Sequence, residues 1–204
     1  MRLYRPLLFA NIIFRKALFR LKVSGKVLYL TFDDGPHPES TSFILQILGK
    51  YSVKAIFFCT GDSATKYPSL LTEIQSEGHI IGNHGFYHLD GFKSTSKDYY
   101  DNIRKAAKIT SDKIFRPPYG RLRLSQYRMI SKTYKIMMWD VMAYDFDRQF
   151  GKKRSFAILK NKIRDGSIIV LHDTPTSTSG EFLEEFINYC YSRDYTFDVP
   201  SIHN

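Results

Sequence analysis

Short apolar runs and amphipathic repeats alternate along the chain from residue 26 onward. The runs are rich in β-branched and aromatic residues, which favour strands. They predict strands at residues 26–32, 55–59, 80–83, 114–116, 135–140, 167–172 and 195–199. Between them, apolar residues recur three and four positions apart, as on one face of a helix. This spacing predicts helices at residues 40–51, 62–77 with an interruption at Pro68, 96–110, 125–132, 155–164 and 180–193.

Regular alternation of strands and helices is typical of a parallel sheet covered by helices. The 204 residues, 43% of them apolar, are enough for one domain with a sizeable core, and no repeat or low-complexity tract divides the chain. We therefore expect one α/β domain over residues 25–204, either a closed β/α barrel or an open sheet. In both folds the carboxyl ends of the parallel strands meet, and the active site lies there.

Residues 1–24 form a separate basic, apolar segment. Their longest uncharged run, residues 6–14, is too short to span a bilayer. Arg15 and Lys16 follow it directly and no small-residue cleavage site appears, so we do not expect a cleavable signal peptide. Two interpretations remain open: a helix lying in a membrane interface, and a helix packed on the domain with its cations in water. A cytoplasmic or peripherally membrane-associated protein is favoured.

The charge and the small motifs exclude several function classes. The formal net charge is +10, but the cations are scattered and no nucleic-acid-binding signature accompanies them, so an anionic surface or substrate is favoured. Cys59 and Cys190 match neither a disulfide framework nor a cysteine zinc site. No G-x-S-x-G elbow, phosphate loop or dinucleotide fingerprint occurs. Water is therefore the expected nucleophile.

Unusual polar residues stand where the predicted strands end. They are Asp33, Asp34, Asn83, His84, His88, Arg116, Asp140 and His172. An ordinary Asp-Gly turn after the first strand would explain one carboxylate of the Asp33–Asp34 pair and leave the other without a partner. Because strand ends converge in a parallel fold, we expect these side chains to lie close together.

The converging residues predict metal-assisted hydrolysis. His84 and His88 are four residues apart and could bind one metal ion together with a carboxylate, a set that leaves coordination positions open on Zn²⁺, Fe²⁺, Co²⁺ or Mn²⁺. The second carboxylate could then act as general base toward a metal-bound water, kept ionised by Arg116. His172 could protonate a leaving amine, with Asp145 orienting its ring.

Five motifs occur in a specific order. They are T-F-D-D-G-P at residues 31–36, H-G-F-Y-H at 84–88, R-P-P-Y-G at 116–120, W-D-V-M-A-Y-D-F at 139–146 and V-L-H at 170–172. With these motifs the sequence resembles the polysaccharide deacetylase family, carbohydrate esterase family 4, over roughly residues 26–172. The resemblance implies a distorted (β/α)7 barrel of parallel strands with the active site at their C-terminal ends.

The resemblance also implies a divalent metal and its ligands. The metal would be Zn²⁺, with Co²⁺, Mn²⁺, Ni²⁺ or Fe²⁺ as alternatives, and its ligands would be Asp34, His84 and His88. Asp33 would be the general base, tethered by Arg116.

Further roles follow from the same resemblance. His172 would be the general acid, paired with Asp145, and the backbone N–H of Tyr119 would help to stabilise the oxyanion. The acyl pocket or the adjacent core would contain Trp139, Phe146 and Val170.

The implied reaction is removal of N-acetyl groups from an amino-sugar glycan, namely peptidoglycan, a chitooligosaccharide or a lipid-linked saccharide. Three departures from the family pattern bear on this: Gly85 replaces the usual Ser or Thr, Phe146 replaces Trp, and Val170 replaces Leu. The last two change the size of the acyl pocket, so a deacylase or deformylase of a non-polymeric amide is an alternative. A catalytically silent glycan-binding envelope protein is another. We expect a monomer, with no nucleic-acid partner and with membrane contact, if any, through residues 1–24.

Overall fold

The computed structural model describes residues 4–6 and 9–201. Its centre is a parallel sheet with the strand order β5-β4-β3-β2-β1-β7-β6, and β8 pairs with the start of β1. The strands are β1 (Val27–Asp33), β2 (Ile56–Cys59), β3 (Ile80–Asn83), β4 (Ile114–Phe115), β5 (Lys135–Ile136), β6 (Val141–Met142), β7 (Ile168–His172) and β8 (Thr196–Phe197). The expected α/β class is confirmed.

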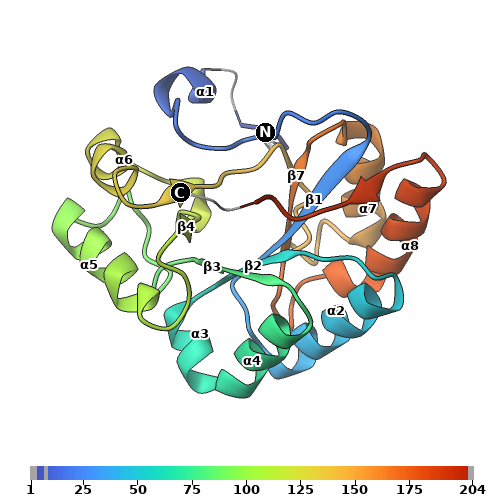
Figure 1. Ribbon diagram of the computed structural model, residues 1–204, viewed down its shortest axis with the longest axis horizontal. Helices are drawn as coiled ribbons and strands as arrows, with labels where there is room; N and C mark the ends of the chain where they lie inside the picture. Colours follow the sequence, from blue (N-terminus) through green and yellow to red (C-terminus); the bar gives the residue numbers. More distant parts are fainter. Residues whose placement is uncertain (1–3, 7–8, 202–204) are drawn as a thin grey trace.

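The helices lie around the outside of this sheet (Figure 1). They are α1 (Ala10–Ile13), α2 (Pro38–Lys50), α3 (Gly61–Lys66), α4 (Pro68–Ser76), α5 (Ser96–Ala107), α6 (Leu124–Ile130), α7 (Lys152–Lys162) and α8 (Ser179–Tyr191), with a 3-10 turn, η1, at Pro118–Gly120. The predicted interruption at Pro68 is confirmed, because proline opens α4 at a position where no helical N–H is needed.

The sheet curls because one short stretch of chain connects its two edges. Met137, just after β5, donates its N–H to Phe115 of β4 at 2.9 Å, and Asp140 donates to Ile168 of β7, also at 2.9 Å. The predicted single strand over 135–140 is therefore wrong. The chain leaves one edge of the sheet after Ile136 and joins the other edge as β6, so the seven strands of the path form a curled, incomplete barrel.

Residues before β1 fill the gap between the two edge strands, β5 and β6, which we call the seam of the barrel. Leu18 donates to Ile136 at 2.9 Å and accepts from Met138 at 2.8 Å, while Tyr4 accepts from Met142 of β6 at 3.0 Å. A helix through residues 1–24 was expected in both interpretations. Within the described residues it is limited to α1, because the chain around Leu18 is held extended by sheet pairing. Residues 1–3, 7 and 8 lie outside the described part. None of the helices described is long and apolar enough to cross a membrane.

Strand β1 lies between two apolar layers. Leu28, Leu30 and Phe32 pack under the outer helices, whereas Tyr29 belongs to the cluster inside the barrel. Strands buried on both faces read as nearly continuous apolar runs, which is the pattern seen in the sequence. Thr31 is the polar residue within this run, and its hydroxyl donates to Ile169 of β7 at 2.7 Å.

Gly82 of β3 provides a test of how tightly the barrel is filled. A Cβ added at Gly82 would lie 2.4 Å from the ring of Phe58, which is fully buried and cannot move aside. We expect Gly82→Ala to lower the free energy of unfolding by about 1–3 kcal/mol, measured by urea denaturation.

Gly49→Ala is the matched control. Gly49 lies in α2, and its added Cβ would meet only a Glu77 oxygen at 4.0 Å. Alanine should therefore stabilise this helix by about 0.5–1 kcal/mol. Equal urea midpoints for Gly82→Ala and the wild type would contradict the tight packing.

Candidate active site

The two neighbouring carboxylates leave β1 in different directions. Asp33 is the last residue of the strand and is in register with His172 of β7. Asp34 has a left-handed backbone (φ 80°), and its N–H still donates to Phe58 of β2 at 3.2 Å. The two successive carboxylates therefore have different surroundings. In a fully extended strand they would point to opposite faces of the sheet, whereas the turn at Asp34 lets both reach the same cavity.

Asp33 is paired with a fully buried arginine. Nη1 of Arg116 donates to Asp33 Oδ1 at 2.7 Å and to the Thr31 hydroxyl at 2.6 Å. The remaining guanidinium nitrogens donate to the carbonyls of Met137 (3.1 Å) and Met138 (2.9 Å). Burial lowers the pKa of Arg116 and the Asp33 carboxylate partly offsets this, so the side chain stays a cation at neutral pH. The tether expected from the sequence is present in the structure.

Asp34, His84 and His88 bring three ligand atoms within 4.8 Å of one another. Asp34 Oδ1 lies 3.4 Å from Nε2 of His84 and 3.1 Å from Nε2 of His88. Burial alone would raise the pKa of Asp34, but the hydrogen bonds that His84 and His88 donate when their Nε2 atoms carry protons outweigh burial and hold the pKa well below its usual value. The carboxylate is therefore ionised at neutral pH.

The tautomer of His84 suits a metal ligand. Its Nδ1 lies 2.8 Å from the carbonyl oxygen of Arg116, which can only accept a hydrogen bond, so Nδ1 carries the proton of the neutral ring. Nε2 then directs a lone pair toward Asp34, whose Oδ1 is buried without a hydrogen-bond partner in the described structure. Converging lone pairs repel unless a cation lies among them. Two imidazole nitrogens and one carboxylate oxygen could hold a divalent ion such as Zn²⁺.

His172 and Asp145 form a second pair on β7 and the loop before α7. The Nδ1 of His172 lies 3.0 Å from Asp145 Oδ1, and the His172 backbone N–H donates to Asp145 Oδ2 at 2.7 Å. Ser177 donates to the same oxygen at 2.6 Å. Burial alone would lower the pKa of His172, but the Asp145 carboxylate outweighs it and raises the pKa to about 9. The ring is therefore a cation at neutral pH.

These groups open into one cavity of about 550 Å³. Its lining consists of Asp33, Asp34, His84, His88, Pro117, Tyr119, Gly120, Arg121, Trp139, Met142, Tyr144, Phe146 and His172. Tyr119 turns through a left-handed conformation (φ 59°), and its ring packs on His88. Phe146 packs on His172 with ring centroids 4.8 Å apart. Val170 is fully buried two positions before His172 and is not part of the lining.

Two strand-end residues of the sequence analysis lie elsewhere. Asp140 directly precedes β6 instead of ending a strand, and its carboxylate accepts hydrogen bonds from Arg164 (3.0 and 2.5 Å) and Ser167 (2.7 Å) at the opposite end of the barrel. Asn83 shapes the histidine loop: its Oδ1 accepts from the N–H of Gly85 at 2.8 Å. Gly85 itself has φ 76°, and a Cβ there would lie 2.7 Å from Asn102, so glycine suits the position.

Several residues at this site were not predicted from the sequence, among them Pro117, Gly120 and Arg121 of the cavity lining. Met142 and Tyr144 also line the cavity; both lie within the motif at residues 139–146, but they received no role because β6 was not recognised as a separate strand. Asp173 is buried beneath the Asp33–Asp34 turn, where its carboxylate accepts from Ser40 and Thr41, both at 2.6 Å. Its position directly after His172 was the available signal.

The buried ion pair predicts a large effect on stability. Arg116→Met removes the cation and leaves Asp33 as an uncompensated buried charge, so we expect the free energy of unfolding to fall by about 3–5 kcal/mol in chemical denaturation. Combining it with Asp33→Asn should recover part of this loss.

Lys97→Met is the control, because Lys97 makes an exposed ion pair with Asp101. Its unfolding should match the wild type. If Arg116→Met unfolds at the same denaturant concentration as this control, the pair does not hold the barrel together.

Known proteins share both the sequence and the fold. The polysaccharide deacetylase family profile matches residues 20–138. The chain is 35% identical over 153 residues to a peptidoglycan-N-acetylglucosamine deacetylase of Bacillus cereus, covering 72% of this chain and 55% of that protein. It is 33% identical over 185 residues to the peptidoglycan-N-acetylmuramic acid deacetylase PdaA of Bacillus subtilis, covering 84% and 69%. It thus spans about half the length of the first relative and about two thirds of the second.

A solved structure agrees with these relatives. The crystal structure of a peptidoglycan N-acetylglucosamine deacetylase in complex with 4-naphthalen-1-yl-N-oxidanyl-benzamide superposes with a TM-score of 0.87 at 28% identity, covering 97% of this chain and 96% of that one. This confirms the (β/α)7 barrel. Because the family profile covers more than half of the chain, the chain belongs to the polysaccharide deacetylase family.

Proposed function

We propose that this protein is a metal-dependent hydrolase that removes N-acetyl groups from an amino-sugar glycan. The observation that carries the proposal is the separation of the two carboxylates after β1: Asp33 is paired with Arg116, and Asp34 faces two histidines. The relatives, which are named as peptidoglycan deacetylases, support a cell-wall glycan as the substrate class.

A divalent metal, most simply Zn²⁺, would be held by Asp34, His84 and His88. When bound, it would polarise the amide carbonyl of the substrate and lower the pKa of a water molecule. The carbonyl of Arg116 fixes the His84 ring for this purpose, so the same residue that pairs with Asp33 also orients a ligand.

Asp33 is the proposed general base. Arg116 holds one carboxylate oxygen, and the other lies 4.0 Å from His84 Nε2 at the edge of the cavity. As the water oxygen attacks the amide carbon, its proton passes to Asp33. The N–H of Tyr119, in the left-handed turn after Pro118, is the proposed donor to the oxyanion.

His172 is the proposed general acid. Asp145 accepts a hydrogen bond from Nδ1–H, which leaves the other ring nitrogen, Nε2, free to face the substrate. As the C–N bond breaks, the protonated ring gives its proton to the leaving nitrogen, and acetate and a free amine result. A raised pKa is what this step needs, because a neutral histidine could not donate.

The apolar side of the cavity is the proposed acyl pocket. Trp139 and Phe146 line it together with Met142 and Tyr144, so an acetyl methyl group and the flat face of a sugar both find apolar surface there. Val170 lies beneath this surface, and its effect on acyl preference would pass through the side chains that cover it.

Acetate release tests the reaction. Purified protein should release acetate from N-acetylglucosamine oligomers, peptidoglycan fragments or lipid-linked saccharides, lose this activity to a chelator and regain it with zinc. Asp33→Asn should lower kcat/KM by about 10²–10⁴-fold, since it removes the base. Asp62→Asn, which alters an exposed carboxylate paired with Lys66, is the control and should keep full activity.

Two results would overturn the proposal. One is undenatured protein that contains no divalent ion and gains no activity from added zinc. The other is glycan binding without acetate release, unchanged by Asp33→Asn, which would favour the silent glycan-binding alternative.

The pH dependence tests His172. Its pKa, raised to about 9, means that the protonated ring stabilises the fold below the unfolded value of about 6.5, and that this contribution is lost as the pH rises through about 9. Activity should fall over the same alkaline range as the acid loses its proton. Asp145→Asn should move the alkaline limb of kcat/KM to lower pH. If the alkaline limb of the kcat/KM profile lies at the same pH in Asp145→Asn as in the wild type, a group other than His172 causes it.

A further inference from the structure

Another large cavity lies on the flank of the barrel and is strongly basic. It has a volume of about 480 Å³ and lies where the segment before β1 fills the seam. Five cations line it, namely Arg5, Arg15, Arg20, Lys22 and Arg164. Asp140 is the one acidic residue in the lining. Its carboxylate already accepts hydrogen bonds from Arg164 and Ser167 and lies 3.5 Å from Nε of Arg5.

The remaining cations of this cavity have no anionic partner in the described part of the chain. Arg15, Arg20 and Lys22 are exposed, and no ion pair among the described residues uses them. The neighbouring sequence offers no compensation either, since the first acidic residue of the chain is Asp33. Burial lowers the pKa of Arg5, the Asp140 carboxylate partly offsets this, and the nearby cations Arg164 and Arg20 lower it again. An anion is therefore the complementary ligand.

Exposed apolar side chains lie next to the cavity, close in sequence to its lining residues Asn11 and Arg15. Phe9, Ile12 and Ile13 around α1 are 55%, 72% and 46% exposed, and Ile12 is the most exposed of the large apolar side chains described. They are not held in a loose loop. Phe14 packs on Tyr127 with ring centroids 5.0 Å apart, and the Lys16 N–H donates to the Tyr127 hydroxyl at 2.7 Å. Phe9, Ile12 and Ile13 are therefore exposed to water on a turn that contacts with Tyr127 hold in place.

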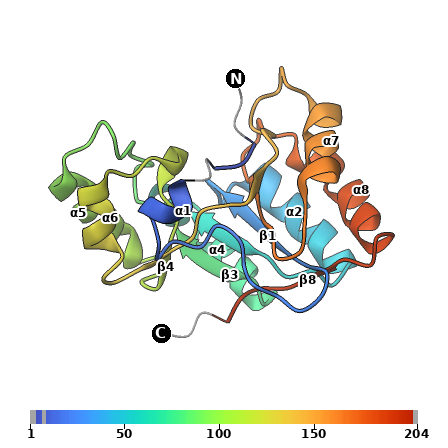
Figure 2. The ribbon, with the colours of Figure 1, turned by 90° about the horizontal axis from the view of Figure 1, so that it is seen from above.

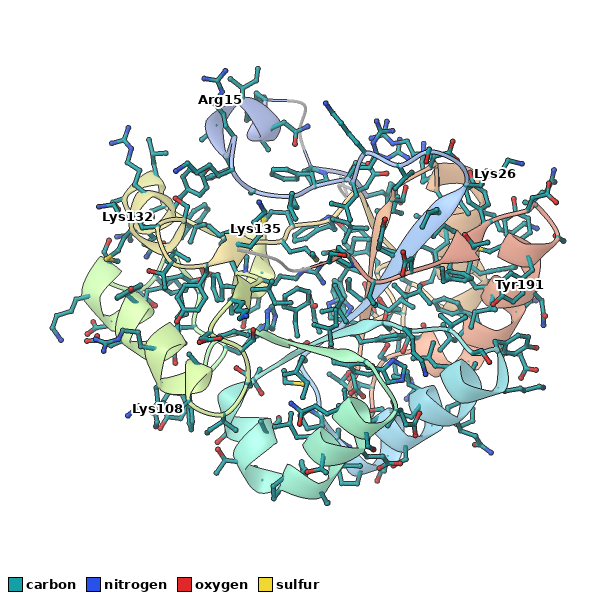
Figure 3. The ribbon with its side chains drawn as sticks, viewed as in Figure 1. Arg15, Lys26, Lys108, Lys132, Lys135 and Tyr191 are labelled. Atoms are coloured by element: carbon teal, nitrogen blue, oxygen red, sulfur yellow. The ribbon has the colours of Figure 1, made fainter. Side chains whose placement is uncertain are left out.

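The arrangement of elements makes this face accessible. In Figure 1, α1 lies at the top, apart from the other helices, and Figure 2 shows it between the α5–α6 side and the α7–α8 side of the molecule. Figure 3 shows Arg15 directed away from the barrel at this edge. Apolar tips and unpaired cations thus face outward together.

We infer that α1 and the basic cavity form a docking face for a membrane surface rich in anionic phospholipid. Phosphate groups would lie against Arg15, Arg20 and Lys22, and Ile12 and Ile13 would enter the boundary between headgroups and acyl chains. Nucleic acid matches only the cations and leaves the exposed apolar groups unexplained. The inference does not depend on the proposed deacetylase activity.

The docking face adjoins the candidate active site. Trp139 lines both the basic cavity and the catalytic one. Tyr4, from the same seam-filling segment, packs on Tyr144 of the catalytic cavity with ring centroids 5.5 Å apart. The two cavities are therefore adjacent at Trp139, whereas Asp140 and Arg164 extend the basic cavity toward the other end of the barrel.

Vesicle sedimentation tests this inference. Full-length protein should sediment with phosphatidylcholine vesicles that contain phosphatidylglycerol, and much less with phosphatidylcholine alone. The triple variant Arg15→Glu/Arg20→Glu/Lys22→Glu should bind the anionic vesicles at least about 100-fold more weakly. Ile12→Ser/Ile13→Ser should weaken binding at least about 10-fold and should make the residual binding more sensitive to salt.

A charge-matched control separates this face from the overall charge. Lys108→Glu/Lys132→Glu/Lys135→Glu changes three exposed lysines of the region around α5 and α6 (Figure 3), and it lowers the formal net charge from +10 to +4, as the first triple variant does. Its vesicle binding should stay within about threefold of the wild type. An equal loss in the two triple variants would overturn the inference, as would equal binding to both kinds of vesicle.

A competition experiment distinguishes a membrane from a soluble anion. Free glycerophosphate should not displace the protein from anionic vesicles, because it lacks the acyl region that the isoleucines enter. Full displacement at millimolar concentration would show a site for a small phosphate compound, and the docking face would be wrong. Matching unfolding curves for all variants, measured in parallel, confirm that these exposed substitutions leave the fold intact.

Discussion

The buried contact between Arg116 and Asp33 is the interaction on which the barrel and the candidate site both depend. The guanidinium follows β4, reaches the end of β1, and donates to two carbonyls of the stretch that runs from β5 to β6. A cation this deep in the protein is tolerated only if its charge and all its N–H groups find partners. These partners come together only when the sheet curls, so satisfying one side chain requires the same curvature that brings the strand ends to one cavity.

The chemistry of the site follows from how the chain separates two adjacent aspartates. Asp33 ends the strand in the interior, where an arginine takes one of its oxygens. Asp34 turns through a left-handed conformation and faces two imidazoles. Two carboxylates on one arginine would share a single environment and differ little in basicity. Here Asp33 is paired with the fixed cation of Arg116, whereas Asp34 and the two histidines are suited to bind a cation from solution. A single short turn can therefore supply both a base and a metal ligand.

The sequence predicted most of this site because its residues stand at strand ends, and parallel strands end at one face. His84, Arg116 and His172 therefore needed only correct strand assignments to be brought together. Asp140 shows the limit of that rule. The pattern predicts that Asp140 ends a strand over 135–140, but the chain crosses the barrel there and Asp140 lies just before the next strand, at the opposite end. The crossing depends on hydrogen bonds to β4 and β7, far away in sequence, so no local pattern could reveal it. Met142 and Tyr144 lie within the motif at residues 139–146, but without this crossing their place in the cavity could not be predicted.

The helix predicted for the segment before β1 is wrong for a related reason: hydrogen bonds to distant strands hold the chain extended. The same hydrogen bonds determine which side chains of this segment are exposed. Its apolar residues repeat closely enough to suggest a helix, but Leu18 and Tyr4 give their backbone groups to the two edges of the barrel. A backbone held in this way cannot rotate its side chains toward one buried face, as a free amphipathic helix would. Phe14 and Phe19 can pack inward, whereas Ile12, Ile13 and the neighbouring arginines remain outside. Closing the seam of the barrel therefore has a consequence at the surface: apolar and cationic groups that the segment cannot bury are exposed together on the flank of the barrel.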